Sequence, residues 1–89
     1  MSIVRLKGKA LRVLVERIYE RDGHCCVACG KWVEPGQKPH HEPPGAGRKS
    51  DEIDKMALLC YECHFKRHHG KECREIKRKV EDYLYEIYH

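Results

Sequence analysis

Two cysteine pairs have the spacing of a zinc site. Cys26 and Cys29 form one Cys-x2-Cys pair. Cys60 and Cys63 form a second pair, and 30 residues lie between Cys29 and Cys60. This spacing lets two thiolates reach one tetrahedral ion, so the two pairs predict a structural Zn²⁺ with four sulfur ligands. Cys25 competes with Cys26, but only Cys26 has the required spacing. The alternatives are buried or redox-active cysteines and a disulfide scaffold. Disulfides are disfavoured, because nothing at the N-terminus resembles a secretory signal.

Four histidines lie between and after the cysteine pairs. His40 and His41 are adjacent, whereas His64 and His68 are four residues apart and would share one face of a helix. Because four thiolates complete a zinc shell, these imidazoles are available for a second site. A neutral imidazole binds metals and acts as a general base near pH 7. One base and one divalent cation are a minimal set for phosphodiester hydrolysis. The alternative for His40 and His41 is a pair of exposed loop histidines.

The composition favours one small soluble domain. Its 89 residues, of which 36% are charged, allow a single small core that a zinc ion would help to stabilise. A net charge of +4 favours a polyanionic partner such as nucleic acid. No apolar run is long enough to cross a membrane, and six cysteines without a signal peptide indicate a reducing cytoplasm. Residues 1–7 are predicted to be a loose basic arm.

Hydrophobic periodicity predicts the elements that hold these motifs. Apolar residues at helical spacing predict amphipathic helices over about 9–21 and 71–88, the second packing on the first. A further helix is predicted from about Tyr61 to His69. Residues 31–33 and 37–42 are predicted to pair as a hairpin that ends at the histidines, around the turn signal Glu-Pro-Gly.

The combined motifs resemble those of HNH endonucleases, in particular the small zinc-knuckled HNH proteins of phages and prophages. The resemblance covers about residues 21–69 and rests on three runs: Arg21-Asp22-x3-Cys26-x2-Cys29-Gly30, His40-His41, and Leu58-Leu59-Cys60-x2-Cys63-His64. It implies a small α+β fold with a ββα-metal core, in which a hairpin and a helix surround one catalytic cation. The four-cysteine knuckle pair would lie in this core, with the terminal helices as flanks. The whole chain, residues 1–89, would form a single HNH nuclease domain.

The resemblance also implies roles for individual residues. His41 corresponds to the general base, while His40 and His64 correspond to ligands of the catalytic cation. His68 matches a further ligand or phosphate contact of the colicin-type nucleases. Three imidazoles suit Mn²⁺, Ni²⁺ or Zn²⁺, so the expected cation is not restricted to Mg²⁺. Glu42 is interpreted as a surface carboxylate, with metal binding as the alternative. Basic residues that flank the site are expected to contact DNA phosphates: Arg48, Lys49, Lys66 and Arg67.

One position departs from the family pattern. The central Asn, which braces the loop that carries the base, is replaced here by Lys55, with Asp54 beside it. A lysine cannot accept the hydrogen bond that the Asn accepts, whereas a carboxylate can. Asp54 is therefore the predicted brace.

The leading hypothesis is a metal-dependent hydrolase that nicks or cuts double-stranded DNA, leaving a 5′-phosphate and a 3′-hydroxyl by resemblance. The resemblance to phage proteins suggests the cytoplasm of a bacterial host and a place in a packaging or recombination assembly. The alternative is a non-catalytic zinc module that binds nucleic acid or a protein, and the missing Asn is the observation that favours it.

Overall fold

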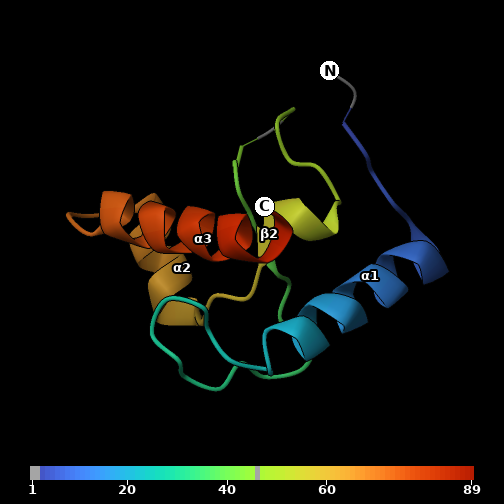
Figure 1. The fold of residues 1–89 in the computed structure, drawn as a ribbon, viewed down its shortest axis with the longest axis horizontal. Coiled ribbons are helices and arrows are strands. Elements are labelled where there is room, and N and C mark those ends of the chain that lie inside the picture. The colour runs from blue at the N-terminus through green and yellow to red at the C-terminus, as the bar shows by residue number, and fades with distance from the viewer. Residues whose placement is uncertain (1–2, 46) are drawn as a thin grey trace.

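The chain has the small α+β fold that its motifs predict. The computed structural model describes residues 3–45 and 47–89. The elements in chain order are α1 (Gly8–Arg21), β1 (His40–His41), the 3₁₀ turn η1 (Ile53–Lys55), β2 (Met56–Ala57), α2 (Tyr61–His68) and α3 (Cys73–Tyr88). Figure 1 labels the three α-helices and β2. Two strands followed by a helix form the centre, with one helix before them and one after. The three α-helices begin and end within about two residues of the predicted positions.

The terminal helices bury one apolar stripe each. The stripes consist of Leu14 and Ile18 on α1, and Ile76, Val80 and Leu84 on α3. Both stripes share one core with the segment 56–59. The four side chains of this segment are almost completely buried. This central segment leads directly into the second cysteine pair, so the core fixes where that pair lies. In the described part of the chain, no helix combines the length and the apolar character needed to cross a membrane.

The C-terminal helix packs chiefly against α2, whereas the sequence predicted that it would pack on the first helix. A short turn that contains Gly70, with φ of 92°, joins α2 to α3 and makes these sequence neighbours packing partners. α3 meets the end of α1 through polar contacts. The Tyr83 hydroxyl donates to Asp22 at 2.5 Å, and the Tyr88 hydroxyl accepts from Arg21 at 3.2 Å.

The strand that carries the histidines pairs with a later segment, which corrects the predicted hairpin. β1 and β2 are antiparallel, with His40 opposite Ala57 and His41 opposite Met56. The predicted partner, residues 31–33, instead contributes an isolated bridge between Trp32 and Cys25. The physical reason is that the first cysteine turn closes on itself, because the Cys26 amide donates to the carbonyl of Lys31 at 2.7 Å.

The N-terminal segment is held in place, so the predicted loose arm is wrong for the residues that are described. The amide of Val4 donates to the Ser50 hydroxyl at 2.9 Å, and its carbonyl accepts from the Asp51 amide at 2.7 Å. The Leu6 amide donates to the Asp51 carboxylate at 2.8 Å. Met1 and Ser2 lie outside the described residues. The arm therefore fixes the loop between the two strands.

Candidate functional site

The two cysteine pairs meet in one cluster. The Sγ atoms of Cys26, Cys29, Cys60 and Cys63 all lie within 4.8 Å of one another. Cys29 and Cys60 are 3.6 Å apart, close to the separation of about 3.8 Å between sulfurs bound 2.3 Å from a tetrahedral zinc. Burial, reinforced by the neighbouring thiols, raises the pKa of Cys63, so thiolates at this spacing need a bound cation. The four residues fit a structural Zn²⁺, and Cys25 is not a member of the cluster.

The cluster connects the first cysteine turn to the start of α2. The Val27 amide donates to the carbonyl of Leu58 at 2.9 Å, which holds the first turn against the segment before the second pair. Gly30, with φ of 81°, provides the left-handed conformation that ends this turn. Cys60 is the N-cap of α2, and its sulfur accepts from the Cys63 amide at 3.4 Å. An ion bound there would fix the first turn of the helix that carries the next two histidines.

Three histidines form a second cluster. His40 on β1 and His64 and His68 on α2 each offer a ring nitrogen, and these atoms lie within 4.8 Å of one another. The Nε2 atoms of His64 and His68 are 3.3 Å apart. Two nitrogens about 2.1 Å from a tetrahedral ion are separated by about 3.4 Å, so this pair fits one cation. The three histidines that the resemblance implies as cation ligands therefore lie together in the fold.

The electrostatic environment favours the neutral form of the two imidazoles on α2, His64 and His68. Burial lowers the pKa of His64 to about 4, and repulsion from His40 and His68 adds to this effect. Burial also lowers the pKa of His68. A neutral imidazole has a free lone pair, which is the form that binds a metal. The cluster is therefore suited to a divalent cation near neutral pH.

Glu42 is hydrogen-bonded to both His40 and Arg67, which fixes the position of the His40 ring. Glu42 Oε1 lies 3.1 Å from His40 Nε2, and Arg67 donates to both carboxylate oxygens, at 2.8 and 2.7 Å. Burial alone would raise the pKa of Glu42, but the hydrogen bonds from Arg67 and His40 lower it to about 2. With Nε2 engaged, Nδ1 of His40 is the nitrogen left for a cation.

These contacts correct two predictions from the sequence. Glu42 is 8% exposed, so it is not a surface carboxylate. Arg67 is 9% exposed and its guanidinium is committed to Glu42, so it is not available as a phosphate contact. In the structure, both residues instead help to hold His40 in the histidine cluster through their hydrogen bonds.

His41 lies beside the cluster and is oriented by a residue that the sequence analysis missed. Its Nε2 atom is 2.8 Å from Asp51 Oδ1, and the second oxygen of Asp51 accepts from the Leu6 amide. Burial would raise the pKa of Asp51, but these hydrogen bonds lower it. Asp54, the predicted brace, is exposed on η1, and Lys55 pairs with a neighbouring glutamate at 3.0 Å. A buried carboxylate ten residues from its histidine leaves no local sequence signal.

A cavity of about 270 Å³ opens onto all four histidines. Its wall also carries three basic residues: Arg5, Lys38 and Lys49. Lys49 was predicted from the sequence, whereas Arg5 and Lys38 were not. Arg5 is distant from the histidines along the chain, but Lys38 lies only two residues before His40, and its position there could have indicated it. A concave surface that combines imidazoles with cationic side chains suits a phosphate group.

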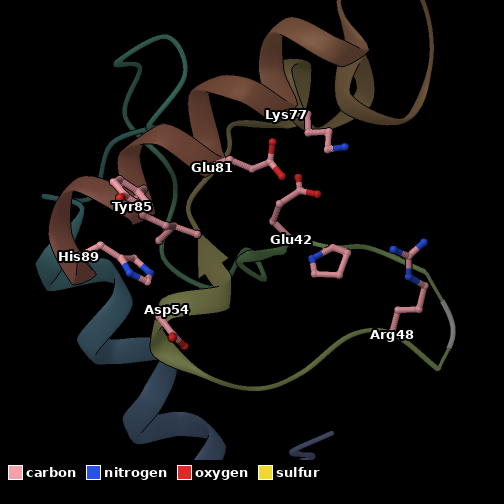
Figure 2. Close-up of a pocket in the computed structure, with 9 residues that line it drawn as sticks. Glu42, Arg48, Asp54, Lys77, Glu81, Tyr85 and His89 are labelled. Carbon is pink, nitrogen blue, oxygen red and sulfur yellow. The ribbon is translucent and has the colours of Figure 1, made fainter. Parts of the chain in front are cut away.

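The other predicted basic contacts lie elsewhere. Figure 2 shows Arg48 and Asp54 at the edge of a separate hollow of about 400 Å³, opposite Glu81 of α3. Lys66 is ion-paired with two glutamates, at 3.6 and 3.1 Å. Of the four residues predicted to contact phosphate, Lys49 is the one that lines the histidine cavity.

Comparison with known proteins assigns no family to the chain. No family model matches it, and neither a curated protein nor a solved structure is significantly similar to it. The functional argument therefore rests on the two clusters and their surroundings.

Proposed function

We propose that this protein is a metal-dependent endonuclease of the HNH type that hydrolyses phosphodiester bonds of double-stranded DNA. The observation that carries the proposal is the shared cavity. His41, which is hydrogen-bonded to Asp51, lines the same cavity as the three clustered histidines, His40, His64 and His68. A candidate base and a candidate cation site thus meet at one point. The four-cysteine cluster would hold a structural Zn²⁺.

The residues of the cavity have complementary parts in this chemistry. His41 would accept a proton from water, and the carboxylate of Asp51 would stabilise the imidazolium that forms. A cation held by the three other histidines would offset negative charge on the phosphate and on the leaving oxygen. Three imidazoles favour Mn²⁺, Ni²⁺ or Zn²⁺, with Mg²⁺ as a further candidate. The lysines and the arginine of the cavity would attract the DNA backbone without reading its sequence.

A plasmid assay tests this proposal. Purified protein is incubated with supercoiled plasmid and each of the four cations in turn. The wild type is expected to nick or linearise the plasmid, and His41→Ala is expected to lose activity by at least about 100-fold, since a positioned base contributes about 10²–10⁴. His89→Ala, at an exposed histidine at the end of α3, should match the wild type. Equal traces of nicking by the wild type and His41→Ala would reject the catalytic role.

The second candidate is a zinc module that binds nucleic acid or a protein without catalysis. Lys55 in place of the family's Asn favours it. This candidate predicts salt-dependent DNA binding that survives the loss of both His41 and His64, with no cleavage in any cation. The hydrogen bond between His41 and Asp51 favours the nuclease, because a binding module has no use for an oriented base.

A further inference from the structure

α2 carries a stripe of exposed rings next to its histidine pair. Tyr61 and Phe65 lie four residues apart on one side of the helix, and His69, the residue that caps its C-terminus, follows at the same interval. Tyr61 is 79% exposed and Phe65 is 56% exposed. The rings of Phe65 and His69 are 4.7 Å apart, tilted by 40°. Exposed aromatic residues in a row, rather than scattered singly, mark an interaction surface.

The stripe borders the candidate cation site. Tyr61 and Phe65 each precede a histidine of the cluster by three residues, so the two sets occupy neighbouring faces of the same helix. The ring centroids of His68 and His69 are 6.5 Å apart, which joins the two faces at the end of α2. A strand whose phosphate lies among the histidines would therefore pass its bases close to these rings.

The surroundings of the stripe fit nucleotides. Phe65 and His69 line a hollow of about 410 Å³ together with Lys66, Lys71 and Glu72, and Lys66 is ion-paired with this glutamate. Lys71 is exposed and has no ion pair within the described part of the chain, so its charge is available to a phosphate. Exposed ring faces beside cations are the composition of surfaces that stack the bases of single-stranded nucleic acid. A continuous duplex hides its base faces inside the stack and cannot use them.

We propose that Tyr61, Phe65 and His69 form a stacking platform for unpaired bases beside the cleaved phosphate. The preferred substrate would then be DNA with a single-stranded segment next to the cleavage site, such as a tailed duplex, rather than an uninterrupted one. This inference rests on the proposed nuclease function, because the platform is defined by its position beside that site.

Binding without cleavage tests the platform directly. In the inactive His41→Ala background, fluorescence anisotropy measures affinity for a single strand, a tailed duplex and a blunt duplex. Tyr61→Ala with Phe65→Ala should weaken binding of the single strand and the tailed duplex by at least about tenfold, and of the blunt duplex by less than about twofold. Tyr85→Ala, which removes a ring of similar exposure on α3, should change none of the three. Phe65→Trp should retain tight binding.

Three results of the binding experiment would overturn the platform: unchanged binding by the double variant, equal losses on all three oligonucleotides, or no binding of any of them. Unchanged binding with normal affinity would leave a protein as the occupant of the stripe. The nuclease proposal is judged separately, from cleavage of tailed and blunt duplexes by the wild type with Mn²⁺. If the wild type cleaves both equally and the double variant does the same, the nuclease stands and the platform fails. If the wild type cleaves neither, the nuclease fails.

Discussion

Asp51 has no visible link to His41 in the sequence, yet it contacts the proposed base through its carboxylate at 2.8 Å. The sequence pointed to Asp54 because the family's brace lies in that region. Whether a carboxylate can reach a given ring depends on the path of the loop between the strands and on the N-terminal segment, which binds Asp51 through the Leu6 amide. The cysteine cluster and the histidine cluster themselves followed from residue type and spacing, because a metal site needs specific donors at short separations.

Asp51 is expected to act as a positioning residue for His41. Asp51→Asn keeps the shape of the side chain but removes its charge and leaves one acceptor oxygen, where the carboxylate has one for His41 and one for the Leu6 amide. The kcat for plasmid cleavage should therefore fall by at least about tenfold. KM and DNA affinity should change by less than about twofold, because Asp51 is buried and contacts His41 rather than the DNA. Asp54→Asn is the matched control and should leave both kinetic constants unchanged. A larger effect of Asp54→Asn than of Asp51→Asn would contradict the assignment.

Arg67 and Lys66 are adjacent on α2 and are expected to respond differently to substitution. Arg67→Ala leaves the Glu42 carboxylate buried without its partner, which should lower the free energy of unfolding by about 3–5 kcal/mol. Lys66→Ala removes exposed ion pairs and should cost less than about 1 kcal/mol. Urea denaturation of the zinc-loaded proteins measures both. Similar values for the two variants would show that Glu42 does not depend on Arg67.

At the scale of the element, α2 depends on the sulfur cluster at its N-terminus. Cys60→Ser removes one zinc ligand and the sulfur that caps the helix, so zinc content and far-UV helical signal should both fall. Chelation of the wild type should have the same effect. Cys25→Ser, which lies outside the cluster, should retain zinc and fold. Freshly purified wild-type protein without zinc, shown by elemental analysis, would refute the site.

The contact between α3 and the end of α1 predicts a loss of stability at high pH. Burial, together with the hydrogen bond to Asp22, raises the pKa of Tyr83 from its usual value of 10 to about 12. A raised pKa for a phenol means that the folded state holds its proton longer. The contribution of the protonated Tyr83 hydroxyl to the free energy of unfolding is therefore complete below pH 10 and is lost as the pH rises through about 12. Tyr83→Phe should flatten this decline by about 2 kcal/mol, measured by urea unfolding from pH 9 to about 12. Tyr85→Phe, at an exposed position, should not.

The helices were predictable and the strand pairing was not, for a physical reason. A stripe such as Ile76, Val80 and Leu84 repeats over several turns, so its period is visible in the sequence alone. β1 and β2 are two residues long, which leaves no alternating pattern to detect. Their pairing depends on the buried segment that begins at Met56, whose position is set by the core rather than by local preference.

At the scale of the whole molecule, the candidate site is assembled from distant parts of the chain. The N-terminal segment supplies Arg5 and fixes Asp51, β1 supplies His40 and His41, and α2 supplies the remaining histidines. One small core and one sulfur cluster hold these parts together. The presence of Arg5 in the cavity, and the absence of Arg48 and Arg67 from it, follow from this assembly and were not visible along the sequence.

The central claim is that the fold, with the sulfur cluster at the start of α2 and β1 paired with β2, places the imidazoles of β1 and α2 so that they share a second cation. Metal content per chain tests it most directly, measured by elemental analysis after saturation with Mn²⁺ and removal of free metal. The wild type should carry tightly bound zinc and, in addition, Mn²⁺ at the histidine cluster. His64→Ala with His68→Ala should keep the zinc and lose the Mn²⁺. A variant that binds as much Mn²⁺ as the wild type, or a wild type that binds none, would contradict the account.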